Sequence, residues 1–261
     1  MAKKFIDKIE RPEGYVVADK TSLKALRFIK NESGWTVVAK KQLKDMIDIK
    51  IPTEYKRQPV TAIGKYAFKD CEGLMSVVIP DTVTVIDEES FYNCASLTTV
   101  SIPKSVVKIG NSAFYYCSHL KTVAIAEGSL LEIIGQWAFY DCKFLVNINL
   151  EVASKLKFIN ESAFFHCVAL TSIVIPEMVG AIAATAFFRC NKLTEVKFLF
   201  TKLWTASGKI IAEEDFTNPS LIATYLREAY FGVDWINTAP AHCQKEAQLK
   251  RINETLAGNQ S

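Results

Sequence analysis

The chain has 261 residues, of which 49% are hydrophobic and 23% charged, and its net charge is +3. This composition suits one soluble globular or elongated unit. The basic start of the chain is followed by no apolar segment typical of a secretory signal, and no run of 18 apolar residues could cross a membrane. We therefore expect a cytoplasmic protein, or a cell-surface protein if a signal has been removed.

Positive charge is concentrated near the N-terminus, where residues 1–58 contain 14 Lys and Arg against 8 Asp and Glu. An excess of this size is typical of a solvated surface. A nucleic acid or an anionic lipid is the alternative partner for such charge, and we do not expect nucleic-acid binding.

Residues 1–50 do not repeat and are expected to form an N-terminal cap. Two strand-like runs, 24–30 and 35–39, are separated by the four residues Asn31 to Gly34. This arrangement is typical of a β-hairpin. A helix that starts at Thr21 or Ser22 is the alternative, and either structure would cover the first coil of the repeats that follow.

Residues 51–198 contain one sequence unit six times. Each copy contains Ala-Phe-x-x-Cys, with Ser in place of Ala in the second copy, followed by Leu-x-x-Val/Ile-x-apolar. The repeated phenylalanines lie 23, 23, 25, 25 and 23 residues apart: Phe68, Phe91, Phe114, Phe139, Phe164 and Phe187. A period of 20 to 29 residues indicates a leucine-rich solenoid, in which stacked coils bury apolar edges that one coil could not bury alone.

Each repeat divides into three pieces. The alternating apolar residues after Leu predict a short strand with one buried face. A Pro ends this strand in most copies, and the Val-x-x-Ile-Gly segment that follows fits a turn. The Ala-Phe-x-x-Cys piece is expected to be a 3₁₀ or irregular half-turn. Two longer copies carry insertions at 126–131 and 151–156, which should bulge without breaking the strand stack.

The repeated pattern, Ile-Pro, then Val-x-x-Ile-Gly, then Ala-Phe-x-x-Cys and Leu, closely resembles the BspA-like leucine-rich repeat family. The resemblance covers about Ile51 to Phe198. It implies a right-handed leucine-rich repeat solenoid with a parallel β-sheet and a mostly irregular or 3₁₀ convex side. It also implies protein-binding or adhesion roles, because members are often surface proteins of host-associated bacteria and parasitic protists. It supplies no catalytic residues.

Six of the seven cysteines occupy one position of the repeat: Cys71, Cys94, Cys117, Cys142, Cys167 and Cys190. Adjacent coils are about 4.8 Å apart, which is within disulfide range. Equivalent side chains in stacked coils point the same way, however, so we expect no bridges. The absence of a Cys-x-x-Cys pair gives zinc little support. We interpret these residues as buried thiols, and Cys243 as a tail residue outside this series.

The outward positions of the predicted strands form a candidate protein-binding surface, the strand face. Its residues are small and uncharged: Ser76, Thr99, Ser101, Thr122, Asn147, Asn149 and Ser172. Hydroxyl and amide groups of this kind would suit a flat protein or an extended peptide. The alternative is that small side chains simply allow tight lateral packing of a curved sheet.

A second candidate is an aromatic column that follows the repeated Phe: Tyr92, Tyr115, Tyr140, Phe165 and Phe188. Rings in this register would stack between coils. If partly exposed, they could instead anchor a partner. The sequence shows no Ser-His-Asp grouping, phosphate-binding loop or paired carboxylates, so we expect no enzyme, cofactor or metal site.

Residues 199–261 are expected to form a C-terminal cap and a helical tail. Asn218-Pro219 is typical of a helix start, and Gly232 is placed to end that helix. The tail from Pro240 to Ser261 is helix-prone but polar, and it could be a weakly docked helix, a frayed end or a docking helix for a partner.

Two functions from different classes follow from these observations. The first is a non-enzymatic protein-binding module that uses its strand face. The second is a structural or assembly component, a rigid spacer with contacts through its caps or tail. A surface adhesin is the further possibility if a secretory signal has been removed.

Overall fold

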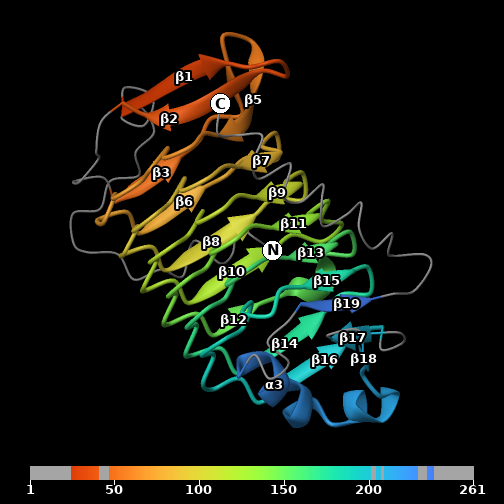
Figure 1. The fold of residues 1–261 in the computed structure, drawn as a ribbon. Coiled ribbons are helices and arrows are strands. Elements are labelled where there is room, and N and C mark those ends of the chain that lie inside the picture. The colour runs from red at the N-terminus through yellow and green to blue at the C-terminus, as the bar shows by residue number, and fades with distance from the viewer. Residues whose placement is uncertain (1–24, 41–46, 201–203, 207–208, 229–233, 238–261) are drawn as a thin grey trace.

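The computed structural model describes residues 25–40, 47–200, 204–206, 209–228 and 234–237, and it confirms the predicted solenoid, with about seven turns and parallel sheets. Figure 1 shows the coils stacked along one axis, with a hairpin of strands β1 and β2 at one end and helix α3 (Pro219–Arg227) at the other.

The six predicted strands, preceded by a seventh from the segment expected to be a cap, form one side of the solenoid. They are β3 (Asp48–Lys50), β6 (Ser76–Val78), β8 (Thr99–Ile102), β10 (Thr122–Ile125), β12 (Asn147–Ile148), β14 (Ser172–Ile175) and β16 (Glu195–Phe198). Pairing is parallel wherever it occurs. In β8 the side chains of Val100 and Ile102 are buried while those of Thr99 and Ser101 are half-buried, which is the alternation expected of a strand with one face on the core.

The two insertions affect this side differently. After β10, the extra residues leave the pairing of that strand with both β8 and β12 intact. After β12, the chain enters a short 3₁₀ helix, η1 (Leu150–Val152), and β12 and β14 touch but belong to separate ladders. The strands stay stacked across both insertions, as expected, and the hydrogen-bonded ladder also stops between β6 and β8, where no insertion lies.

A second parallel sheet forms where the sequence predicted a turn. It runs through β5 (Gln58–Ile63), β7 (Val85–Ile86), β9 (Lys108–Ile109), β11 (Ile133–Ile134), β13 (Phe158–Ile159) and β15 (Ala181–Ile182). Most of these strands have two residues, which is too short for an alternating pattern to be visible in the sequence. The buried isoleucines of this sheet, such as Ile86 and Ile109, close the core opposite the first sheet.

The glycines after these short strands allow coils to approach closely. A Cβ atom added at Gly135 would lie 2.6 Å from the carbonyl carbon of Gly110 and 2.7 Å from the backbone nitrogen of Asn111. Any side chain here would collide with the backbone of the preceding coil. The glycine is thus required by coil stacking.

The Ala-Phe-x-x-Cys pieces are successive turns, so the irregular alternative is correct for them. The repeated Phe side chains are fully buried and stack along the solenoid with ring centroids 5.1–5.3 Å apart. We call this row the Phe spine. The turns are tight enough to hold non-glycine residues in the left-handed region, such as Tyr116 at φ 57° and Asp141 at φ 59°.

The N-terminal hairpin is confirmed. β1 (Leu26–Lys30) and β2 (Trp35–Ala39) pair antiparallel, and the Asn31 N–H donates to the Gly34 carbonyl at 3.1 Å. β2 then pairs in parallel with β5, and β4 (Glu54–Tyr55) pairs antiparallel with β5, which joins the hairpin to the second sheet. The alternative helix start at Thr21 or Ser22 lies outside the described residues.

Helix α3 starts where the sequence predicts. Pro219 is its first residue, and the Asn218 side chain accepts a hydrogen bond from the Leu221 N–H at 3.1 Å. It ends at Arg227 rather than near Gly232, because the Arg227 carbonyl accepts the Arg189 N–H of the last coil at 2.9 Å. The helix end is thereby fixed on the solenoid.

The remaining C-terminal elements extend the second sheet. β19 (Trp235–Asn237) pairs antiparallel with both β15 and β17 (Trp204–Ala206). β17 also pairs antiparallel with β18 (Lys209–Ile210). The 3₁₀ helix η2 (Glu213–Thr217) precedes α3. Gly232, Cys243 and the tail from Pro240 lie outside the described residues. Within the described ranges, no helix is long and apolar enough to span a membrane.

Candidate functional site

The middle of the strand face is formed by β8, β10 and β12 in strict register. The Cα partners are Thr99, Thr122 and Asn147 along one row, and Ser101 lies opposite Ala124 in the next. The two threonines and Ser101 are half-buried, and Asn147 is exposed. None of these outward side chains carries a charge, so three neighbouring strands present one continuous neutral surface.

Asn149 has a structural role that the sequence did not indicate. Its side-chain oxygen accepts the Ile125 N–H at 2.7 Å, and its amide donates to the Ile125 carbonyl at 2.9 Å. The side chain thus takes over the ladder at the point where β12 stops. The amide oxygen and nitrogen of Asn149 already form these hydrogen bonds, which limits the hydrogen bonds that Asn149 could form with a partner.

The two ends of the predicted strand face differ from its middle. The Ser76 hydroxyl is buried and donates to the Asp48 carboxylate on β3, so this side chain is not accessible at the surface. β3, which lies in the segment expected to cap the solenoid, covers it. Ser172 is exposed, but its neighbour in register is the charged Glu195. The neutral surface is therefore confined to β8, β10 and β12.

The aromatic column is a half-buried stack. Ring centroids are 4.9 Å apart between Tyr92 and Tyr115, 4.6 Å between Tyr115 and Tyr140, and 4.7 Å between Tyr140 and Phe165. Phe188 is tilted by 58° at the far end, and the Lys69 ammonium lies 4.4 Å from the Tyr92 ring at the near end. Because the ring faces contact each other, the column offers mainly ring edges to its surroundings.

Two tyrosines of the column, Tyr115 and Tyr140, are held neutral. Burial, followed by a hydrogen bond with Tyr116, raises the pKa of Tyr115, and burial raises the pKa of Tyr140. A raised phenol pKa removes these groups as bases near neutral pH. The hydrogen bond with Glu89 raises the pKa of Lys69, which keeps the ammonium charged beside the first ring.

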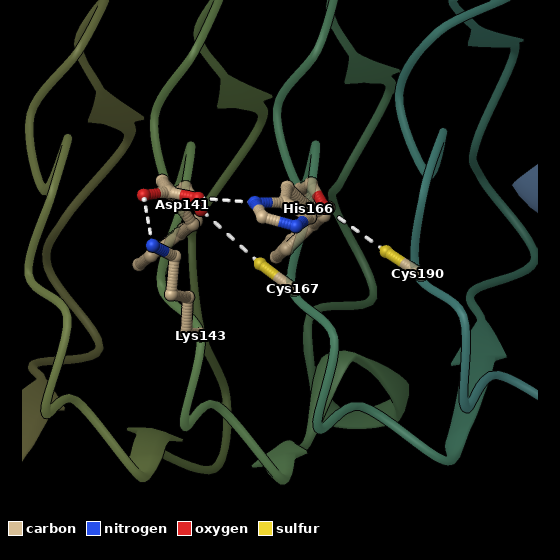
Figure 2. A network of polar contacts seen from close by, with 7 residues as sticks. Asp141, Lys143, His166, Cys167 and Cys190 are labelled. Carbon is tan, nitrogen blue, oxygen red and sulfur yellow. Dashed lines mark hydrogen bonds and ion pairs between the residues drawn. The ribbon is translucent and has the colours of Figure 1, made fainter.

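The cysteines act as hydrogen-bond donors, which the sequence did not reveal. From Cys94 to Cys190, each thiol donates to the carbonyl of the spine Phe in the preceding coil, with sulfur–oxygen distances of 3.0–3.2 Å. Figure 2 shows the thiols of Cys167 and Cys190 directed toward the neighbouring coil. The predicted burial is confirmed for all six, and the described residues contain no disulfide.

Burial also sets the chemistry of these thiols. It raises the pKa of Cys94, Cys117, Cys142 and Cys167 well above the ordinary thiol value. Because the thiolate is the reactive form, these groups are poor nucleophiles in the folded protein.

A comparison with known proteins identifies the repeat. The BspA type leucine rich repeat region matches in six copies over residues 42–152 and 128–221. The chain belongs to the BspA-type leucine-rich repeat family. No curated protein matches the chain. BspA-type repeats form protein-interaction or adhesion modules and are typically non-enzymatic scaffolds.

Solved structures of bacterial leucine-rich repeat proteins share this fold. A T. pallidum leucine rich repeat protein, TpLRR, is 22% identical with a TM-score of 0.53, over 65% of this chain and 88% of that one. A leucine-rich repeat protein from Eubacterium ventriosum is 21% identical with a TM-score of 0.52, over 64% of this chain. The present chain spans only 44% of that second protein. These similarities concern the fold alone.

One polar cluster in the BspA-type array resembles catalytic machinery but lacks its geometry. Asp141 contacts both the His166 ring and, at 3.2 Å, the Lys143 ammonium (Figure 2). The nearby Cys167 thiol donates to the Phe139 carbonyl instead of to His166. The cluster is a polar network between two coils. Among the described residues, no three His, Cys, Asp or Glu side chains are grouped to hold a metal ion.

Proposed function

We propose that this BspA-type chain is a non-enzymatic protein-binding module whose contact surface is the middle of the strand face. The observation that carries the proposal is the register of β8, β10 and β12, which brings Thr99, Thr122 and Asn147 into one neutral row. A neutral surface with hydroxyl and amide groups can be desolvated by a partner at lower cost than a charged one, and it still offers hydrogen bonds.

The arrangement of the ends supports binding through the strand face rather than a spacer role. Helix α3 packs on β16 at one end of the array, and the β1–β2 hairpin continues the second sheet at the other. The helix opposes, at its end, the end-to-end stacking that an assembling spacer would use. The strand face lies between the caps and spans several coils (Figure 1). If the chain is displayed at a cell surface, the same face would serve an adhesin.

The double substitution Thr122→Arg with Asn147→Glu is expected to abolish partner binding. It places bulk and two opposite charges on the neutral row and leaves the net charge unchanged. Outward residues do not support the core, so the free energy of unfolding should change by only about 0.5 kcal/mol per site. Binding would be measured with phage-displayed random peptides of about twelve residues, selected on the full chain as candidate extended ligands.

The matched control is Ser154→Arg with Asn191→Glu, which introduces the same residues at exposed turn positions. It should leave the affinity of the selected peptides within about twofold of the unsubstituted chain. If the strand-face double variant keeps full affinity as well, the proposed contact surface is wrong. The contacts of the neutral row should themselves depend weakly on salt, whereas binding through the basic N-terminal segment alone would weaken steeply as salt is added.

A further inference from the structure

One edge of the strand face carries exposed apolar and basic side chains together. Phe144 and Val146 precede β12 with exposed fractions of 51% and 49%, and His119 and Lys121 precede β10 in the adjacent coil and are also exposed. We call these four residues the basic–apolar edge. Large apolar side chains this exposed, and adjacent to a surface with a proposed binding role, are typical of an interaction site.

The four side chains form a contiguous patch across two coils. The rings of His119 and Phe144 stack with centroids 5.6 Å apart and an angle of 13° between planes. The Val146 N–H donates to the Lys121 carbonyl at 3.0 Å, so these two residues also lie side by side. The corresponding positions of the flanking coils hold small or polar residues: Ser96, Thr98, Ala169 and Thr171. The patch is thus a local departure from the repeat.

Charge is distributed unequally between the two edges of the strand face in these coils. His119, Lys121 and Lys143 lie before the strands, and Lys143 is already paired with Asp141. Glu127 and Glu151 follow the same two strands and are exposed at the opposite edge. A partner that crosses the face would therefore place its carboxylates over Lys121 and keep them away from the glutamates.

The chain's own terminal segments do not complement this charge. Residues 1–24 contain six Lys and Arg against four Asp and Glu, and residues 238–261 contain three against two. Both segments are net positive, as the patch is. Charge complementarity thus favours a separate, acidic partner over either terminal segment.

We infer that the partner of this protein presents an acidic segment with a large apolar side chain, which packs on Phe144 and Val146 while neighbouring carboxylates pair with Lys121. The inference rests on the proposed function, because it specifies which ligand the strand face would take. Phe144 supplies the apolar contact at the edge, and the charge of Lys121 orients the acidic segment of the partner on the strand face.

The test is the composition of the displayed peptides selected on the full chain. The enriched peptides should be net negative and should contain an aromatic or large aliphatic residue. Lys121→Glu and Phe144→Ala should each weaken their binding by about tenfold. Added salt should weaken binding to the unsubstituted chain, because it screens the attraction between Lys121 and the carboxylates of the peptide. Glu127→Lys, a charge change of the same size and opposite sign at the opposite edge, should leave the affinity within about twofold or strengthen it.

The outcomes separate this inference from the function on which it rests. Peptides that lose binding to Thr122→Arg with Asn147→Glu, but are neutral or basic and insensitive to Lys121→Glu and Phe144→Ala, would overturn the inference and leave the strand-face function standing. Displacement of the selected peptides by a synthetic peptide of residues 238–261 would also overturn it, because the tail would then be the occupant. Peptides that bind every strand-face variant equally would contradict both the acidic-partner inference and the strand-face function.

Discussion

Phe114→Ala is expected to lower the free energy of unfolding by about 3–5 kcal/mol, because it leaves a cavity in the Phe spine. The Phe114 ring is fully buried and is stacked on Phe91 at 5.1 Å and on Phe139 at 5.3 Å. Each coil depends on its neighbours, so the loss should affect the array beyond the substituted coil.

Phe144→Ala is the matched control, since it removes the same side chain from an exposed position in the following repeat. Its cost should stay within about 0.5 kcal/mol. Unfolding of both variants in urea would be monitored by circular dichroism and by tryptophan fluorescence. A loss below about 1 kcal/mol for Phe114→Ala would mean that the ring does not lie in the core and that the repeat register is wrong.

Alkaline pH is expected to destabilise the protein steeply above about pH 9, because the unfolded chain releases thiol protons that the folded one retains. Burial raises the pKa of Cys94, Cys117, Cys142 and Cys167 in the folded state. A raised native pKa leaves stability intact below the unfolded value of 9.0 and removes it progressively as pH rises toward the native value. Each such thiol contributes a slope of up to about 1.4 kcal/mol per pH unit to the free energy of unfolding. The slope of the four together should approach about 5 kcal/mol per pH unit.

The measurement is the free energy of unfolding between pH 8 and pH 11 under reducing conditions, which prevent oxidation of the released thiols. Cys117→Ala serves as the control, because it removes one titrating group and should reduce the slope by about 1.4 kcal/mol per pH unit. The lower absolute stability of this variant does not affect the slope. An equal slope in the unsubstituted protein and in Cys117→Ala would contradict the burial of the repeat thiols. Prompt reaction of the six repeat thiols with a maleimide at pH 8 would contradict it as well.

The parts of the fold that the sequence predicted share one property, a repeated apolar residue whose environment is the same in every coil. Phe114 and Cys117 recur at fixed spacing, and stacking equivalent residues is the arrangement that buries them all. The start of α3 was predictable for a different reason. Asn218 and Pro219 form a local cap signal that needs no tertiary information.

The parts that it missed depend on contacts between different coils. Two-residue strands such as β9 show no periodicity, and their pairing is visible only once coils are stacked. The burial of Ser76 depends on β3, and the bonds of Asn149 depend on the backbone of Ile125 in the preceding coil. The basic–apolar edge was missed because Phe144 and Val146 occupy repeat positions at which most other coils hold small or polar residues.

The claim that binding occurs on the strand face is tested most directly by mapping where a bound peptide touches the chain. A selected peptide that carries a photoreactive group would be cross-linked to the full protein, and the modified residues would be located by mass spectrometry. We expect modification within β8, β10 and β12 and at the basic–apolar edge before them. Modification of the second sheet, from β7 to β13, or of α3 would show that the strand face is not the binding surface.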